Sequence, residues 1–191
     1  MKINVEIPKF LLETVEVELP KYSNTLISII NNNARATRPI SIGNLGKLKS
    51  EFKGETFEEF KKFLLDNNPK MIETAVEKIL NKAEEMELRP SYINYRTVKI
   101  WLENLIFIKT FRGLYFESLC FKTISKKFNM EFIKGTIEDD SKGVDGFLNN
   151  KPYNVKSSTY KNKHDKSTRV NCDIIFYNIK KNTLEIEYNE I

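Results

Sequence analysis

The hydrophobic pattern changes character about two-thirds of the way along the chain. In the first part, apolar residues recur every three or four positions, which is typical of amphipathic helices. A stripe of this kind usually forms a core, so we assign these helices no chemistry by default. The first helix is expected to begin at Ser23. Further helices are expected within residues 56–86, 91–109 and 114–128, with a break at Gly113.

Local signals mark where some of these helices begin. Thr56-Phe-Glu-Glu59 has the sequence of a capping box. Asn68-Pro69 is typical of an N-cap followed by proline at the first helical position. Prolyl and glycyl breaks interrupt residues 34–46, so a loop is expected there.

After about residue 128 the pattern becomes alternating, as in half-buried strands. Turns are expected at Asn149-Asn150 and at residues 180–182. Alternation near the N-terminus also predicts strands over residues 2–7 and 15–19. The expected C-terminal strands cover residues 131–137, 143–148, 153–157, 172–179 and 184–188.

This order of elements predicts an α+β fold, with a mixed central β-sheet flanked by helices and a largely helical N-terminal half. We expect one domain over residues 1–191, with residues 1–110 mostly helical and residues 111–191 forming the sheet core.

The composition is that of a globular protein, with 40% hydrophobic and 30% charged residues in 191. No apolar run reaches the roughly 18 residues that a membrane span needs, and the N-terminus lacks the apolar core of a signal peptide. We therefore expect a cytoplasmic protein without a membrane partner.

Cysteine and histidine are too scarce for several kinds of site. Cys120 and Cys172 lie far apart and outside any CxxC spacing, so we expect free, buried thiols. His164 is the single histidine, which argues against a histidine-based triad or a histidine-ligated metal. Carboxylates and lysines remain for any chemistry.

The positive charge is concentrated in one segment. Residues 151–169 contain six cations and one acid, which accounts for the whole formal net charge of +5. A lysine run is usually a solvated face, but such a segment also suits a phosphate backbone. The candidate phosphate contacts are Ser157, Lys161, Lys163 and Arg169.

Asp145 and Lys156 stand on the two strands of an expected hairpin. Strand alternation places Asn154 and Lys156 on the same face, and Asp145 approaches that face from the neighbouring strand. A carboxylate that holds Mg²⁺ and a lysine that orients water are the minimum for metal-assisted phosphodiester hydrolysis. A solvated hairpin would give the same pattern, so the motif alone is weak.

Further carboxylates strengthen the nuclease interpretation. Glu117 lies among apolar neighbours in the helix that precedes the sheet, where it could supply a second acid. Asp140 ends the acidic run Glu138-Asp-Asp, just upstream of Asp145. A carboxylate cluster that faces a lysine suits a divalent cation.

The helix followed by strands with Gly143-Val-Asp-Gly and Asn154-Val-Lys156 resembles the PD-(D/E)xK nuclease superfamily. More narrowly, the chain from about residue 31 to its C-terminus is similar to the MjaI-type family of type II restriction endonucleases. The segments that carry this similarity are Asn33-Ala-Arg-Ala-Thr-Arg-Pro, Ile108-Lys-Thr-Phe-Arg-Gly-Leu-Tyr-Phe-Glu and Gly143-Val-Asp-Gly-Phe.

The resemblance implies a role for each acid and for the lysine. Asp145 would be the metal-binding aspartate, Lys156 the catalytic lysine and Glu117 the helix acid. One departure stands out, because Asn154 occupies the position of the second acid in the superfamily pattern. Either one Mg²⁺ suffices, or Glu117 or Asp140 supplies the missing carboxylate.

The resemblance also implies a partner and a target. The substrate would be double-stranded DNA with a short palindromic site, for which CTAG is our candidate, cut by a homodimer that works beside a DNA methyltransferase. Residues 1–110 would then serve DNA recognition and dimerisation. Candidate base-reading residues are Arg35, Thr37, Arg38, Lys163 and His164.

Other functions stay open at this point. The same chemistry fits a structure-specific or repair nuclease, such as a junction resolvase. Asn154 favours a DNA-binding protein without catalysis, and the charge alone would fit a helical protein whose basic segment contacts RNA. Arg35 and Arg38 could also belong to a loop that packs on the core.

Overall fold

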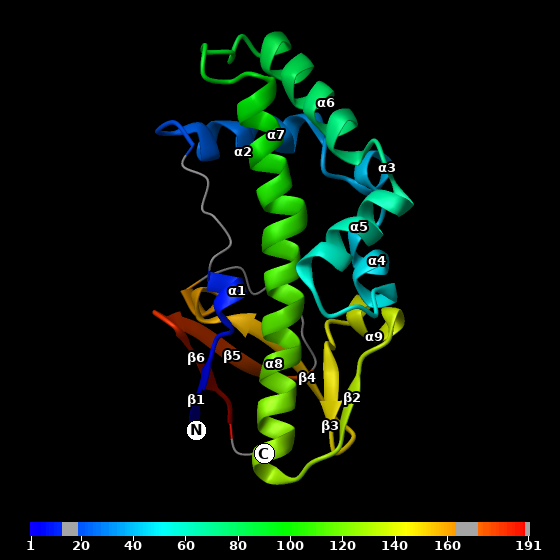
Figure 1. Ribbon diagram of the computed structural model, residues 1–191, viewed down its shortest axis with the longest axis vertical. Coiled ribbons are helices and arrows are strands. Elements are labelled where there is room, and N and C mark those ends of the chain that lie inside the picture. Colours follow the sequence, from blue (N-terminus) through cyan, green and yellow to red (C-terminus); the bar gives the residue numbers. More distant parts are fainter. Residues whose placement is uncertain (13–18, 163–171, 190–191) are drawn as a thin grey trace. The chain divides into compact units, whose positions relative to one another are not determined.

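The computed structural model describes residues 1–12, 19–162 and 172–189 (Figure 1). Contacts divide the chain into two compact units. The helical unit comprises Val15–Phe111, and the sheet unit comprises Met1–Thr14 with Arg112–Ile191. Most of the strand expected over residues 15–19 lies outside the described residues, and the single-domain expectation stays a prediction.

The helical unit is built on the predicted amphipathic stripes. Ile27, Leu64, Ile79 and Leu102 are fully buried in it, and α6 packs against α2, α3 and α7. Its helices are α2 (Ser23–Ala34), α3 (Pro39–Ile42), α4 (Leu45–Glu51), α5 (Phe57–Asn67), α6 (Met71–Glu85), α7 (Tyr95–Glu103) and the π-helical segment η1 (Asn104–Lys109).

The two predicted helix starts have different outcomes. The Thr56–Glu59 capping box is confirmed, because the Thr56 hydroxyl accepts a hydrogen bond from the Glu59 N–H and the Glu59 carboxylate accepts one from the Thr56 N–H. The start at Asn68-Pro69 is wrong, since α6 begins at Met71. The Asn68 amide instead donates to the Ser41 carbonyl at 3.3 Å, so a long-range contact replaces the local cap.

The loop expected over residues 34–46 contains helices. Pro39 occupies the first turn of α3, and Asn44 caps α4 by accepting a hydrogen bond from the Lys47 N–H at 3.1 Å. Ser41 and Ile42 are buried, which explains why the segment is ordered despite its proline and glycine.

The break expected at Gly113 is wrong. Helix α8 (Thr110–Phe128) continues through it, and no atom lies within 4 Å of the place where a side chain would begin. Glycine costs a helix only about 1 kcal/mol relative to alanine. Burial of Phe116 and Phe121 on the same helix outweighs that cost.

The sheet unit contains one six-stranded sheet in the order β1-β6-β5-β4-β3-β2. β4 and β5 pair in parallel, and the other neighbours are antiparallel. This mixed sheet with helices confirms the α+β prediction. The strands are β1 (Lys2–Glu6), β2 (Phe132–Lys134), β3 (Gly146–Leu148), β4 (Lys151–Ser157), β5 (Asp173–Lys180) and β6 (Thr183–Glu187).

Two short connections shape the edge of the sheet that holds the hairpin. The expected turn at Asn149 and Asn150 is confirmed, with φ values of 46° and 63° that suit a two-residue hairpin loop. The strand expected over residues 131–137 is wrong at its end, because Thr136 caps a short helix there, α9 (Ile137–Ser141). The remaining helices of this unit are α1 (Lys9–Leu12) and the 3-10 turn η2 (Ser158–Asn162).

Helix α8 covers one face of the sheet, as Figure 1 shows for its C-terminal half. Phe116 packs against Tyr177 of β5 at 5.5 Å between ring centroids, and Phe121 stacks on Phe132 of β2 at 4.7 Å. Ile175 and Leu184 are fully buried on the same side. The Arg112 guanidinium donates to the Leu11 carbonyl, which attaches α1 to the helix.

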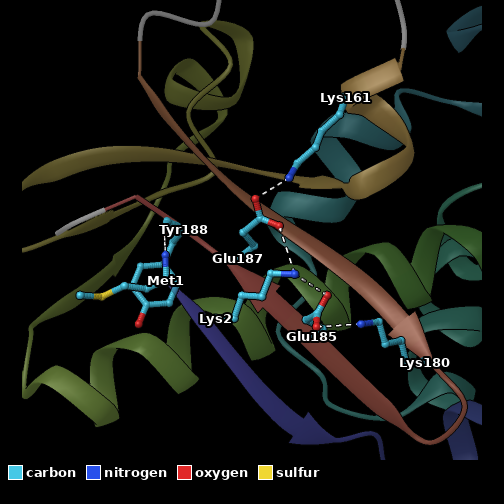
Figure 2. Close-up of polar contacts among 7 residues, drawn as sticks. All are labelled: Met1, Lys2, Lys161, Lys180, Glu185, Glu187 and Tyr188. Carbon is cyan, nitrogen blue, oxygen red and sulfur yellow. Dashed lines mark hydrogen bonds and ion pairs between the residues drawn. The ribbon is translucent and has the colours of Figure 1, made fainter.

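The opposite face carries a network of charged side chains (Figure 2). Glu185 binds both Lys2 and Lys180, at 3.2 and 2.8 Å, and Glu187 binds Lys161 at 2.5 Å. Hydrogen bonds from Lys180 and Lys2 lower the pKa of Glu185, and the bond from Lys161 lowers the pKa of Glu187. The contrast between the faces explains the alternating pattern of β5 and β6.

Both cysteines are free thiols, as expected. Cys120 is buried and Cys172 is half-buried. Burial raises the pKa of the Cys120 thiol far above its usual range. Within the described ranges, no helix is both long and apolar enough for a membrane span.

Candidate active site

Asp145 is fixed at the start of β3 by its backbone and by its side chain. Its N–H donates to the Tyr153 carbonyl at 2.9 Å. Its Oδ2 accepts a hydrogen bond from the Val155 N–H at 2.7 Å. The carboxylate thus serves as the acceptor for this backbone N–H of β4. This contact holds the carboxylate beside the residue that precedes Lys156.

The approach of the backbone to Asp145 requires glycine at position 135. The Gly135 N–H donates to the Asp145 carbonyl at 3.1 Å. A Cβ at this position would lie 2.8 Å from the Val144 carbonyl oxygen, which is closer than real Cβ contacts come. The chain before α9 therefore packs directly on the loop that carries Asp145.

Asn154 is almost completely enclosed, with 1% of its surface exposed. Its Nδ2 donates to the Gly143 carbonyl at 2.8 Å. Its Oδ1 is buried and has no hydrogen-bond partner among the described residues. The Cys172 thiol donates to the same Gly143 carbonyl at 3.5 Å, so two side chains bind one backbone oxygen.

The Cys172 thiol interacts electrostatically with Asp145 and with Lys156. Burial raises the pKa of Cys172, and the charges of Asp145 and Asp173 raise it further, whereas the charge of Lys156 lowers it. Asp145, Asp173 and Lys156 thus all lie within electrostatic range of the Cys172 thiol.

Cys172 and Asp173 were missed by reasoning from the sequence. Asp173 forms an ion pair with Lys151 at 2.7 Å, and an open cavity of about 380 Å³ is lined by these two residues with Pro152 and Cys172. The parallel pairing of β4 and β5 brings these two residues to the site, because it places Asp173 at the start of β5 opposite Tyr153. Such long-range pairing leaves no local trace in the sequence.

β4 is a regular strand, so Asn154 and Lys156 lie on one face of it. Their partners on β5 are Ile174 and Phe176, which alternate with the residue that packs against α8, Tyr177. Asn154 and Lys156 therefore lie on the face that α8 does not cover.

Glu117 belongs to the other face. It is half-buried on α8. Burial is the main cause that raises the pKa of both Cys120 and Tyr177, and the charge of Glu117 adds to it in each case. The structure does not gather Glu117 with Asn154 and Lys156 on one face of the sheet.

The acids of α9 have separate surroundings. Glu138 pairs with Lys142 at 2.7 Å, and Asp139 caps α9 through Thr136, whose hydrogen bonds lower the pKa of Asp139. The Asp140 side chain is exposed, and its backbone carbonyl accepts a hydrogen bond from the Gly143 N–H at 2.9 Å. Asp140 is thus one short turn away from the Asp145 loop.

The oxygen atoms around Asp145 can be compared with the needs of Mg²⁺. In the part of the chain that the structure describes, no three His, Cys, Asp or Glu side chains gather to hold a metal. Magnesium, however, usually keeps several waters and binds one or two carboxylates with substrate phosphates. The Asp145 carboxylate and the unpartnered Asn154 Oδ1 fit that kind of sparse, all-oxygen site.

Two of the predicted phosphate contacts lie at the end of β4, where Ser157 is the last residue, and in the following turn η2, which holds Lys161. The hydroxyls of Ser157 and Thr159 share a hydrogen bond at 3.1 Å. Lys161 is paired with Glu187 (Figure 2). Its ammonium also lies over the Phe176 ring, 4.6 Å from the ring centroid. Lys163, His164 and Arg169 lie outside the described residues.

The predicted base-reading residues belong to the helical unit. Arg35 ends α2 with a φ of 51°, and Arg38 precedes α3; both side chains are exposed. The Thr37 hydroxyl accepts a hydrogen bond from the buried Asn31 amide at 3.1 Å, which holds the segment between the two arginines.

Comparison with known proteins identifies relatives along most of the chain. The chain is 34% identical over 182 residues to the type II restriction enzyme MjaI of Methanocaldococcus jannaschii, covering 91% of this chain and 82% of the relative. It is 33% identical over 170 residues to the type II restriction enzyme MthZI of Methanothermobacter thermautotrophicus, covering 88% and 84%. No solved structure matches the chain.

The family model for the MjaI restriction endonuclease matches residues 24–188. This range includes Asp145, Asn154 and Lys156, and it extends over both units. The resemblance found in the sequence is thereby confirmed: the chain belongs to the MjaI restriction endonuclease family, whose named relatives are type II restriction enzymes.

Proposed function

We propose that this chain is a Mg²⁺-dependent type II restriction endonuclease that hydrolyses phosphodiester bonds in double-stranded DNA at a short palindrome. The observation that carries this proposal is the 2.7 Å hydrogen bond from the Val155 N–H to the Asp145 carboxylate. It holds a half-buried acid beside the residue that precedes Lys156, whose strand face α8 does not cover. The candidate target, CTAG, rests on the family resemblance.

Each residue of the pair has a distinct task in this proposal. Asp145 holds the metal ion through its carboxylate, and Lys156 orients the attacking water and offsets phosphate charge. When bound, Mg²⁺ would stabilise negative charge on the phosphate and favour ionisation of water. Asn154 offers a neutral oxygen next to them.

A second carboxylate would come from Asp140 or Glu117. Asp140 is supported by its place on the turn that leads into the Asp145 loop, where its carbonyl accepts a hydrogen bond from the Gly143 N–H. Glu117 is less favoured, because α8 covers the face of the sheet that bears Tyr177.

DNA contacts are divided between the two units. Ser157 and Lys161 would meet the phosphate backbone, as would Lys163 and Arg169, which lie outside the described residues; His164, also outside them, stays a candidate for base reading. Arg35, Thr37 and Arg38 would read bases, which is supported by two exposed guanidinium groups on an anchored segment.

The symmetry of a palindrome implies the assembly. We propose a homodimer in which each subunit cuts one strand, because a two-fold site is matched by a two-fold protein. Such an enzyme would act in the cytoplasm beside a DNA methyltransferase that protects the host site.

Incubation of plasmid DNA with the protein and MgCl₂, repeated with EDTA, tests the proposal. Discrete fragments that disappear with EDTA are expected. A smear would favour a structure-specific or repair nuclease. Shifted but intact DNA would favour a binding protein without catalysis, the candidate that the neutral Asn154 supports.

A further inference from the structure

Asn154 binds the chain segment that carries the proposed metal-binding acid. Its Nδ2 donates to the Gly143 carbonyl at 2.8 Å, a contact between β4 and the loop before β3. Gly143 has a φ of 80° and donates its own N–H to the Asp140 carbonyl. Gly143, two residues before Asp145, is therefore held through both its N–H and its carbonyl.

The neighbouring contacts fix the remainder of this loop. The Val144 N–H donates to the Asp139 carbonyl, and the Asp145 N–H donates to the Tyr153 carbonyl, both at 2.9 Å. The Cys172 thiol is a second, weaker donor to the Gly143 oxygen at 3.5 Å. Among these contacts, the Asn154 amide is the strong side-chain donor that links the loop to β4.

A carboxylate could not make this contact. Aspartate has the shape of asparagine but offers only acceptor oxygens when it is ionised. At position 154 it would place one of those oxygens against the Gly143 carbonyl oxygen, inside an environment where 1% of the side chain is exposed. Two buried acceptors in contact repel each other, and the Gly143 carbonyl would keep only the weak bond from the Cys172 thiol.

The amide, in contrast, supplies the donor that the Gly143 carbonyl needs. Nδ2 holds the Gly143 carbonyl, and Oδ1 is left buried without a hydrogen-bond partner in the described part of the chain. A protonated acid could donate as well, and burial favours that form, but the positive charge of a nearby Mg²⁺ would favour the ionised form, which cannot donate. Asparagine is thus suited to this position by its donor.

We propose that Asn154 is a positioning residue that holds the Asp145 loop through the Gly143 carbonyl, and that this task requires an amide where the superfamily pattern has an acid. The inference rests on the proposed function, in which Asp145 binds the metal. Asparagine in place of the acid is then a structural requirement of this loop, and Asn154 supports activity by holding the loop in place.

Asn154→Asp is the decisive variant, because it changes one N–H donor into an acceptor at constant size. Asn150→Asp is the matched control, with the same chemical change at an exposed turn of the same hairpin. Single-turnover cleavage of plasmid DNA is measured against Mg²⁺ concentration, together with DNA affinity in EDTA. Loss of an outer contact to a metal ligand typically costs 10–100-fold.

Asn154→Asp is expected to cleave roughly 10–100-fold more slowly than wild type at saturating Mg²⁺, with DNA affinity unchanged. Asn150→Asp should match wild type. If position 154 acts only as a metal ligand, the added charge should lower the Mg²⁺ concentration needed for half-maximal rate and preserve cleavage. That result would overturn the inference while leaving the proposed function intact.

Hydrogen–deuterium exchange gives a readout that does not depend on activity. The amides of Val144, Asp145 and Val155 are expected to exchange faster in Asn154→Asp than in Asn150→Asp, whereas the β5–β6 hairpin is unchanged. Equal exchange in both variants overturns the inference, even if wild type fails to cut DNA and the proposed function falls. Should the Asp variant not fold, Asn154→Ala is compared in the same way, and unchanged exchange again overturns it.

Discussion

The Asp145 carboxylate accepts a hydrogen bond from the backbone N–H of Val155 at 2.7 Å. An acid is thus bound by the strand that also carries Lys156, one residue further along. The position of the carboxylate depends on a main-chain donor of β4, which substitutions at Asp145 and Lys156 themselves leave in place. Single-residue variants can therefore separate the chemistry of this hairpin from its geometry.

Replacing Asp145 by asparagine should abolish cleavage and preserve DNA binding. The amide oxygen of Asn can still accept the Val155 hydrogen bond, so the loop keeps its geometry and loses only the charge. We expect the rate to fall by at least about 10²-fold, as for the loss of a single electrostatic group in a catalytic site. Plasmid cleavage and a gel shift in EDTA measure the two effects, with the exposed Asp66→Asn as control. Full cleavage by the Asp145 variant would remove this residue from the proposed site.

Lys156→Ala should also abolish cleavage, whereas DNA affinity should fall only slightly. Lys156 is half-buried, and its charge lowers the pKa of the Cys172 thiol, which burial and the charge of Asp145 raise. Lys134→Ala removes an exposed lysine from the same sheet and should cleave like wild type. Single-turnover rates at saturating DNA provide the comparison, and equal rates in the two variants would exclude a catalytic role for Lys156.

Glu187→Gln should strengthen DNA binding if Lys161 contacts phosphate. In the structure Glu187 holds the Lys161 ammonium at 2.5 Å, and an exposed ion pair of this kind is worth up to about 1 kcal/mol. Removing the acid frees the cation, so affinity should rise by up to roughly fivefold at low salt. Fluorescence anisotropy with labelled duplex measures this. The gain should vanish in a Lys161→Ala background; a gain that persists there would mean that Lys161 is not the phosphate contact.

The stabilising effect of Glu185 should depend on pH. Hydrogen bonds from Lys180 and Lys2 lower its pKa in the folded protein, so its contribution is present above the usual glutamate pKa and is lost as the pH falls through the lowered value. Glu185→Gln should therefore lower the thermal midpoint at pH 7, and this difference should shrink as the pH falls below the usual glutamate pKa. Circular dichroism melts of the variant and of Glu131→Gln, an exposed glutamate outside this network, provide the test. A difference that grows toward acid pH would contradict this assignment.

Arg38→Ala should weaken or relax sequence recognition by roughly 1–3 kcal/mol if the guanidinium reads a base. The segment around it is anchored, since Lys78 donates to the Ser41 hydroxyl at 2.6 Å, so the exposed side chain can be removed without disturbing α3. Cleavage of cognate and single-substituted duplexes measures the effect. Arg96→Ala, at another exposed position of the helical unit, should leave discrimination unchanged. Identical behaviour of the two variants would exclude Arg38 as a reader.

Features that depend on neighbouring residues could be predicted from the sequence. The Thr56–Glu59 capping box and the Asn149-Asn150 turn are local, because each is formed by side chains or backbone angles within four residues. The helical first part of the chain and the strands that follow it, and so the α+β class, could be predicted from the hydrophobic periodicities.

Features that depend on distant partners could not be predicted. Asn68 was expected to cap α6, but its amide binds Ser41 instead. The face on which Glu117 lies depends on how α8 packs against β5, and the approach of Cys172 to Gly143 depends on parallel pairing between β4 and β5. In each case the deciding contact joins residues that are remote in the sequence.

The two-residue turn at Asn149 and Asn150 sets how Asp145 and Lys156 are placed relative to each other. It aligns Gly146 with Tyr153, and this register brings Val155 to the Asp145 carboxylate. A strand shifted by one residue presents every side chain to the opposite face. One residue inserted into this turn would therefore point Lys156 toward α8 and separate it from Asp145, so the length of a solvent-exposed loop limits how the proposed active site can change in evolution.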